Sequence, residues 1–156
     1  MGWKDCYNHK FGLALRIPEW CRNAKVSFNG KEADIASTLV DGYIIIRREW
    51  KDGDKIGLDL SMEPVRMRSN PLVRADIGKV AIQHGPLVYC LEEVDNGPNL
   101  QTIVLPKDSK LEVSYREDLL GGVNVISTQG EKAKGAAWGS ELYRADAGAE
   151  YEPIDL

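Results

Sequence analysis

Hydrophobic and polar residues alternate along several short stretches in the first half of the chain. In residues 11–17 an apolar side chain stands at every second position, and the same pattern recurs in residues 56–62. A period of two places apolar side chains on one face of an extended strand, so each stretch predicts a half-buried β-strand. Further strands are predicted over residues 25–28, 31–35, 43–47, 65–68, 80–83 and 87–91.

Turn signals separate these predicted strands. Asn29-Gly30 is the strongest of them, because both residues tolerate the positive φ that a two-residue hairpin requires. Asp52-Gly53-Asp54 also predicts a hairpin turn, since the regularly spaced acidic ligands of a calcium loop are missing around it. Short strands with a turn about every 8–12 residues are typical of sandwiches and barrels. The sequence therefore predicts an all-β fold, an antiparallel β-sandwich that is incomplete at its edges and is followed by a smaller β module.

The most informative apolar stretch lies within residues 79–97. Its second strand, residues 87–91, is apolar on both faces, which is typical of a central strand covered on two sides. Polar residues and the turn signal Asp95-Asn96-Gly97-Pro98 follow it. We therefore predict a β-sandwich accessory domain over residues 1–96 and a smaller β-rich module over residues 97–156.

The second module has a weaker pattern than the first. Residues 102–105, 111–115 and 123–127 predict strands, and residues 116–120 predict a helical turn. Glycine, alanine and charged residues dominate the chain from Thr128 onward. We therefore predict a mobile Gly/Ala-rich loop over residues 129–139.

Composition restricts the classes of function. The 156 residues are 43% hydrophobic and 28% charged, and they carry a net charge of −4 with acidic and basic residues interspersed. This balance is typical of soluble globular proteins and lacks the basic face of a protein that binds nucleic acid. No apolar run is long enough to span a membrane, and the first residues lack the apolar core of a secretion signal, which predicts a cytoplasmic protein.

Residue types that carry chemistry are few. Cys6, Cys21 and Cys90 are odd in number and widely separated, which favours packing thiols over a disulfide framework or a zinc site. His84 has no nucleophile near it in the sequence, which favours a ring hydrogen-bonded to backbone at a strand break. The adjacent Glu92-Glu93 side chains point to opposite faces of an extended strand, so they cannot face each other as a glycosidase pair. We therefore expect no catalytic, cofactor-binding or metal-binding residue in this chain.

Aromatic side chains offer a candidate binding surface. Flat aromatic faces stack on sugars, so Trp20, Trp50 and Tyr43 are candidates for stacking against a glycan. Trp20 and Trp50 also stand at the ends of predicted strands, where they would cap the core of a sandwich. The sequence leaves both interpretations open.

Three segments carry a family resemblance. They are LALRIPEWCRNAKVSFNG (residues 13–30), GYIIIRREWKDGDKIGLDL (42–60) and HGPLVYCLEEVDNG (84–97), with DLLGGVNVIS (118–127) as a looser match. These segments resemble the C-terminal region of glycoside hydrolase family 127, the β-L-arabinofuranosidases and their relatives. In that family an (α/α)6 barrel precedes this region and carries a cysteine nucleophile, a glutamate acid/base and a zinc site. The barrel's adjacent cysteine pair has no counterpart here, so the resemblance transfers no catalytic role and no cofactor to this chain.

The resemblance implies that this chain is a region of a larger enzyme and carries no catalytic residues itself. We expect a non-catalytic structural or accessory C-terminal fragment of a glycoside hydrolase, whose parent hydrolyses arabinofuranosyl glycosidic bonds. Its expected partner is the catalytic (α/α)6 barrel, and exposed sheet edges near residues 11–17 or 65–68 favour a homodimer. The alternative is a stand-alone carbohydrate-binding β-sandwich module. A hydrolase with its own site would need an acidic cleft that the sequence does not show.

Overall fold

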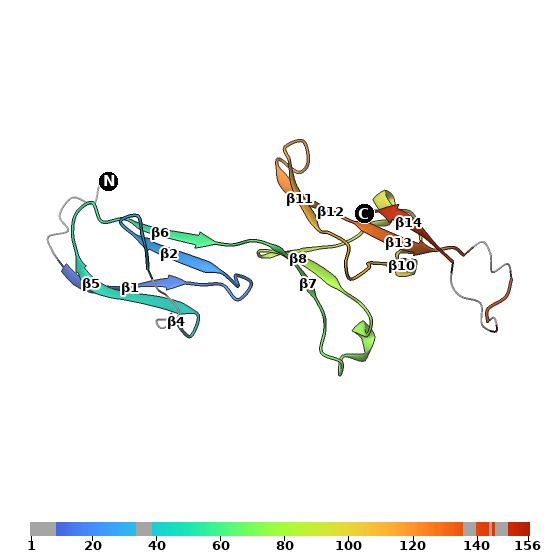
Figure 1. The fold of residues 1–156 in the computed structure, drawn as a ribbon, viewed down its shortest axis with the longest axis horizontal. Coiled ribbons are helices and arrows are strands. Elements are labelled where there is room, and N and C mark those ends of the chain that lie inside the picture. Colours follow the sequence, from blue (N-terminus) through green and yellow to red (C-terminus); the bar gives the residue numbers. More distant parts are fainter. Residues whose placement is uncertain (1–8, 34–38, 136–139, 144, 146–149) are drawn as a thin grey trace. The chain divides into compact units, whose positions relative to one another are not determined.

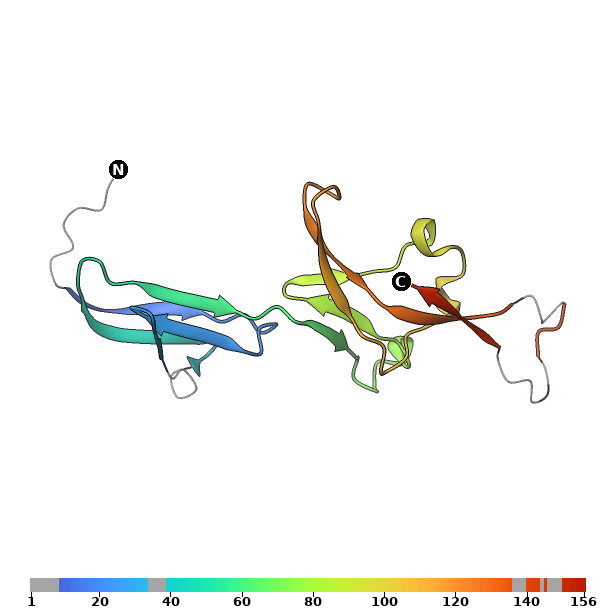
Figure 2. The ribbon, with the colours of Figure 1, turned by 45° about the horizontal axis from the view of Figure 1, so that its top comes forward.

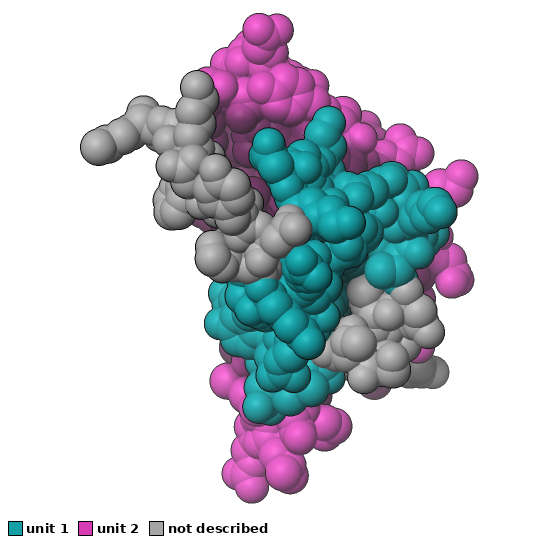
Figure 3. All heavy atoms as spheres, turned by 90° about the vertical axis from the view of Figure 1, so that its left-hand side faces the viewer, with its two compact units in different colours: residues 1–63 teal, residues 64–156 magenta. Residues whose placement is uncertain are grey.

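The computed structural model describes residues 9–33, 39–135, 140–143, 145 and 150–156. Within these residues the regular structure is almost entirely antiparallel β-strand, and the helices are α1 (Glu93–Asn96) and two short 3₁₀ turns. The predicted all-β fold is therefore confirmed. The chain divides into two compact units, unit 1 (Met1–Glu63) and unit 2 (Pro64–Leu156), which Figure 3 distinguishes by colour.

Unit 1 consists of two three-stranded antiparallel sheets (Figures 1 and 2). The first sheet contains, in spatial order, β1 (His9–Arg16), β5 (Tyr43–Trp50) and β4 (Leu39–Val40). The second sheet contains, in spatial order, β3 (Lys31–Ala33), β2 (Ala24–Phe28) and β6 (Ile56–Leu60). Each strand predicted from alternation in this unit overlaps an observed strand.

The core of unit 1 lies between the two sheets. Val26 on β2 and Ile44 on β5 are 1% and 2% exposed, so each sheet supplies one almost fully buried side chain. Along β5 the burial alternates, and odd-numbered residues such as Tyr43 and Ile45 are exposed. The alternation that predicts the strand is thus the alternation between core and solvent.

An aromatic cluster closes one end of this core. The Trp50 indole N–H donates to the Phe11 carbonyl oxygen at 3.1 Å, and the two rings stack with centroids 5.5 Å apart. Phe28 meets Trp50 edge-on at 6.2 Å, and the Arg48 guanidinium carbon lies 3.7 Å from the centre of the Phe28 ring. Because Phe11 and Trp50 belong to the first sheet and Phe28 to the second, the cluster ties the two layers together.

Two hairpin turns in unit 1 follow the sequence rule. Asn29 and Gly30 have φ of 47° and 79°, and Asp41 and Gly42 have φ of 50° and 78°. Positive φ at both central residues is what a primed two-residue turn needs to match the twist of its strands. The predicted Asn29-Gly30 hairpin is confirmed as the connection between β2 and β3.

The turn between β5 and β6 is held by Asp54. Its two carboxylate oxygens accept hydrogen bonds from the Asn29 side-chain amide and the Lys51 backbone N–H, each at 3.0 Å. The Asn29 side-chain oxygen in turn accepts the Lys55 backbone N–H at 2.8 Å. Asp52-Gly53-Asp54 is therefore a hydrogen-bonded turn, as predicted.

The Asp54 contacts predict an acid-sensitive step in stability. The Asn29 amide and the Lys51 N–H hold the pKa of the Asp54 carboxyl below its usual 3.8. A pKa lowered by folding stabilises the folded state above the unfolded pKa, and this contribution is lost as the pH falls through the folded pKa. We expect Asp54→Asn to be less stable than the native chain at pH 7, with the difference shrinking below about pH 4. Urea midpoints measured from pH 7 to pH 2 check this, and a native advantage that persisted at pH 2 would contradict it. Asp52→Asn is the control in the same turn.

Unit 2 consists of three small antiparallel sheets (Figures 1 and 2). One contains β7 (Pro64–Met67), β8 (Ala81–His84) and β9 (Leu87–Tyr89) in that order. Another contains β10 (Ile103–Val104), β13 (Gln129–Ala133) and β14 (Tyr151–Asp155) in that order. The third is a two-stranded hairpin of β11 (Glu112–Arg116) and β12 (Val123–Ser127).

The division between the units differs from the predicted boundary after residue 96. It falls between Glu63 and Pro64, because β8 pairs with β7 on one side and with β9 on the other, and among the described residues none of these strands pairs with a strand of unit 1. In this sheet Val65 lies opposite Gln83, and Gln83 lies opposite Val88. The C-terminal unit is therefore the larger one, and the apolar stretch of residues 79–97, with strands β8 and β9, belongs to it.

Three further expectations for unit 2 are wrong. β9 is a sheet edge and not a covered central strand, and its Val88 is 69% exposed. Gln129–Ala133 is the central strand β13 rather than part of a loop, because β10 and β14 supply ladder hydrogen bonds on both sides. Residues 136–139 of the predicted loop lie outside the described residues. The expected helical turn at residues 116–120 is the end of β11 and the following hairpin turn.

The two predicted edge strands are edges in the described part of the chain. β1 ends the order of the first sheet of unit 1, and β7 ends the order of its sheet in unit 2. Self-association through these edges remains a prediction.

Candidate functional site

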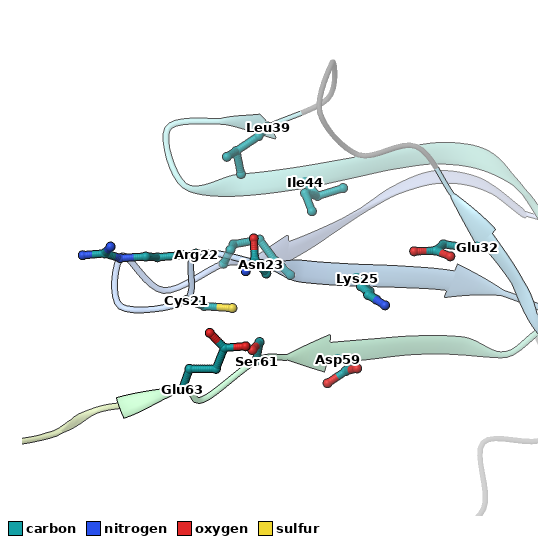
Figure 4. Close-up of a pocket in the computed structure, with 12 residues that line it drawn as sticks. Cys21, Arg22, Asn23, Lys25, Glu32, Leu39, Ile44, Asp59, Ser61 and Glu63 are labelled. Atoms are coloured by element: carbon teal, nitrogen blue, oxygen red, sulfur yellow. The ribbon is translucent and has the colours of Figure 1, made fainter. Parts of the chain in front are cut away.

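A cleft of about 790 Å³ opens in unit 1 (Figure 4). We call it the unit 1 cleft. Its apolar wall includes Leu39 and Ile44 of the first sheet, and its other wall comes from β2, β6 and the segments beside them. The polar side chains that line it are Arg22, Asn23, Lys25, Glu32, Asp59, Ser61 and Glu63.

The polar lining mixes charges of both signs. Lys25 on β2 lies directly opposite Asp59 on β6 in the strand register. Figure 4 shows Ser61 and Glu63 following Asp59 along the same wall. Within the described part of the chain, none of these side chains makes a hydrogen bond or ion pair. The cleft therefore presents free donors and acceptors to a polar ligand.

The arrangement in the cleft is not a catalytic constellation. Nucleophilic catalysis needs a nucleophile with a base within hydrogen-bond reach. The Cys21 thiol lines the cleft, but no histidine is among its described lining residues. The predicted absence of catalytic residues stays a prediction, and the geometry of the cleft gives no reason to assign one.

The zinc that the resemblance implies for the parent enzyme does not fit the described residues. No three His, Cys, Asp or Glu side chains among them lie close enough together to hold a metal ion. Structural and catalytic zinc sites both use at least three protein ligands. We therefore derive no metal chemistry for this chain.

The candidate stacking residues do not gather on one surface. Tyr43 and Trp50 stand at opposite ends of β5, roughly 23 Å apart for seven steps of a strand. Trp50 stacks on Phe11 and donates its N–H within unit 1, as expected of a residue that caps a core. Tyr43 is exposed on the outer side of β5, and Trp20 is half-buried in the turn after β1. None of the three lines the unit 1 cleft.

The other singled-out residues have structural surroundings. His84 is 6% exposed and meets the Tyr89 ring edge-on at 6.3 Å, whereas the sequence predicted a ring satisfied by backbone. Glu92 and Glu93 are exposed, and the Glu93 carboxylate accepts the Asn99 backbone N–H at 3.0 Å.

The cysteines divide between core and surface. Cys21 is buried, as expected for a packing thiol, whereas Cys90 is exposed just after the edge strand β9. Cys6 lies outside the described residues. The expectation of a packing role therefore fails for Cys90, because no described residue of unit 2 covers its side chain.

Sequence reasoning missed the unit 1 cleft. Its lining comes from six separate segments of the chain, and their convergence depends on how the two sheets pack. A local pattern holds no signal for such a convergence.

No described helix is both long enough and apolar enough to cross a membrane.

Two family models match the chain. The model described as "Beta-L-arabinofuranosidase, GH127 middle domain" matches residues 3–62, and the "Glycoside hydrolase family 127 C-terminal domain" matches residues 64–134. The border between the two models coincides with the division between unit 1 and unit 2.

Similar proteins are longer than this chain. A non-reducing end β-L-arabinofuranosidase from Bifidobacterium longum subsp. longum is 39% identical over 121 residues, which are 75% of this chain and 18% of that protein. The structure of Ara127N-Se, a GH127 β-L-arabinofuranosidase from Geobacillus stearothermophilus T6, is 48% identical with a TM-score of 0.90. The match covers 94% of this chain and 23% of that one. The structure of the GH127 β-arabinofuranosidase BT3674 is 30% identical with a TM-score of 0.78, and the match covers 96% of this chain and 25% of that one. This chain thus spans a fifth to a quarter of these relatives.

Proposed function

The chain belongs to glycoside hydrolase family 127, and we propose that it serves as a non-catalytic structural region of an enzyme of that family. In this proposal it packs against the part of the polypeptide that carries the chemistry, an (α/α)6 barrel by the family resemblance. The whole enzyme hydrolyses β-L-arabinofuranosyl or related glycosidic bonds.

Apolar side chains exposed on ordered strands carry the proposal. In unit 2 they occur on four different strands: Met67, Leu87, Val88, Val104, Val113 and Tyr115. Single exposed apolar residues are ordinary, but repeated exposure along strands is typical of surfaces that another body covers. The similar proteins supply a reason for such a body, since about three quarters of each solved relative lies outside the match.

A chimera tests the proposal. The region of the Geobacillus stearothermophilus enzyme that this chain matches is replaced by residues 1–156. We expect the isolated chain to leave an aryl β-L-arabinofuranoside intact, and the chimera to hydrolyse it with kcat/KM within about tenfold of the parent enzyme. The parent enzyme without the matched region is the control. Turnover by the isolated chain, or a folded but inactive chimera, would contradict the proposal.

The unit 1 cleft supports a second candidate function, a carbohydrate-binding module. Its free donors and acceptors would suit a polyhydroxylated ligand, and its volume falls in the range of small-ligand sites. No aromatic ring is among its described lining residues, which removes the stacking face that sugar sites use. Saturable shifts on titrating the isolated chain with arabinose-containing oligosaccharides would favour this candidate over the structural one.

A further inference from the structure

The β11–β12 hairpin of unit 2 has one strand, β11, that is exposed along its whole length. Among the described residues no third strand pairs with the hairpin, and all five residues of β11 are exposed. An isolated two-stranded hairpin is marginally stable in water. Its described side-chain anchor is the Tyr89 hydroxyl, which donates to the Asn124 carbonyl oxygen at 2.8 Å.

One face of the hairpin is mostly apolar, with Asn124 as its polar residue. Val113 lies opposite Ile126, and Tyr115 lies opposite Asn124, so these side chains share a face of the two-stranded sheet. Tyr115 is 66% exposed although it belongs to a strand. In the turn that follows β11, Leu119 and Leu120 are exposed as well, at 41% and 88%.

The hairpin tip holds a leucine in the left-handed region of φ. Leu120 has φ of 50° and is 88% exposed. The other described non-glycine residues with positive φ are Asn29, Asp41 and Asn99, whose short polar side chains tolerate this region. A bulky apolar residue in this conformation is strained, and such strain clusters at binding and functional sites.

The tip is nevertheless ordered by its own contacts. Arg116 donates two hydrogen bonds to the Asp118 carboxylate, at 2.9 and 2.7 Å, and the Gly122 N–H donates to the Leu119 carbonyl oxygen at 2.8 Å. Arg116 also lowers the pKa of Asp118 to about 2, so this pair stays charged at neutral pH. Gly122 has φ of 105°, a conformation in which an L side chain is strained, and a Cβ atom there would also lie 2.0 Å from the Tyr115 hydroxyl, so the turn favours glycine. The tip therefore presents Leu120 in a defined geometry rather than as a loose end.

We infer that the tip of the β11–β12 hairpin, led by Leu120 with Leu119 and Tyr115, inserts into an apolar pocket on the remaining part of a family 127 polypeptide. This inference rests on the proposed function. The match accounts for 23–25% of the solved relatives, so most of such a polypeptide lies outside it and can supply the pocket. Exposed apolar side chains on a preordered, strained turn lose little conformational entropy on docking.

The charge of the tip argues for this occupant over a second copy of the chain. Arg116 and Asp118 neutralise each other, which leaves the exposed Glu117 as a net negative charge beside Leu120. A two-fold dimer built on the tip would bring both Glu117 carboxylates to one apolar contact, and like charges repel there. The pocket we infer is therefore apolar with a basic rim.

The test compares amide exchange at residues 116–122 in the isolated chain and in the Geobacillus chimera. We expect exchange at the tip to slow by at least about tenfold in the chimera. Leu120→Asn should remove most of that protection, because asparagine keeps the left-handed turn but cannot fill an apolar pocket. In the isolated chain the same substitution should leave the urea midpoint equal or higher, since it relieves the strained leucine. The same substitution is thus expected to weaken protection of the tip in the chimera and not to destabilise the isolated chain.

Leu142→Asn is the matched control, since Leu142 is also a leucine of unit 2 and is 84% exposed. It should leave tip protection in the chimera unchanged. Equal exchange at the tip in both proteins would overturn the inference. If β7 or β9 exchanges more slowly in the chimera and the tip does not, the result supports the structural role and contradicts docking at the tip. If no segment exchanges more slowly, the result contradicts both. If the chimera does not fold, the residue of the Geobacillus enzyme that aligns with Leu120 is replaced by asparagine instead. Amide exchange at the tip is then compared between that variant and the unchanged Geobacillus enzyme.

Discussion

Replacing Ile44 by alanine should lower the free energy of unfolding of unit 1 by about 2–5 kcal/mol. Ile44 is 2% exposed, and it comes from the central strand of its sheet. Alanine removes apolar surface from the core and leaves a cavity that the two sheets cannot fully close. Because domains are stable by only about 5–15 kcal/mol, the expected loss is a large share of the total.

Urea unfolding followed by circular dichroism measures this loss. Ile45→Ala is the matched control, because it makes the same chemical change one position along β5 at an exposed site. The control should cost less than about 1 kcal/mol. Equal losses for the two variants would contradict the placement of the core between the two sheets of unit 1.

Replacing Trp50 by alanine should cost about 3–5 kcal/mol. The Trp50 ring stacks on Phe11, meets Phe28 edge-on and donates its N–H to a carbonyl oxygen. Alanine would remove the Trp50–Phe28 contact between the two sheets and leave the Phe11 carbonyl without its donor. The same residue is a candidate for glycan stacking, so the variant also separates two roles.

Trp50→Phe serves as the control for the packing role. Phenylalanine keeps an aromatic ring and loses the N–H, so we expect a cost of about 1 kcal/mol. Both variants are compared by urea midpoint and by titration with arabinose-containing oligosaccharides. A Trp50→Ala protein with native stability and lost oligosaccharide binding would assign Trp50 to a glycan site instead of the core.

The elements that the sequence predicts well are governed by local physics. β12 is observed at Val123–Ser127, as predicted, and β5 and β6 overlap their predicted ranges. Side chains of a strand alternate between two faces, so a strand with one buried face has apolar residues at every second position of its sequence. The turn at Asn29-Gly30 follows in the same way, because tolerance of positive φ is a property of the residue itself.

The elements that the sequence misses depend on partners far along the chain. β13 has few apolar residues, and it is a strand because β10 and β14 lie beside it. β9 has apolar residues on both faces, and it is an edge because no strand of unit 2 covers it in the described residues. Strand pairing is decided by long-range contacts, which outweigh local propensity.

The sequence by itself determined the all-β class, the principal hairpin turns and, through its motifs, the family of this chain. The tertiary structure alone decided the division at Glu63 and Pro64, the convergence of separated polar residues on the unit 1 cleft, and the exposure of Leu120 at the hairpin tip. The physical reason is the separation in sequence between the residues that interact. Alternation and turn preference act between neighbouring residues, whereas sheet order, clefts and uncovered faces follow from the packing of segments that are distant in sequence.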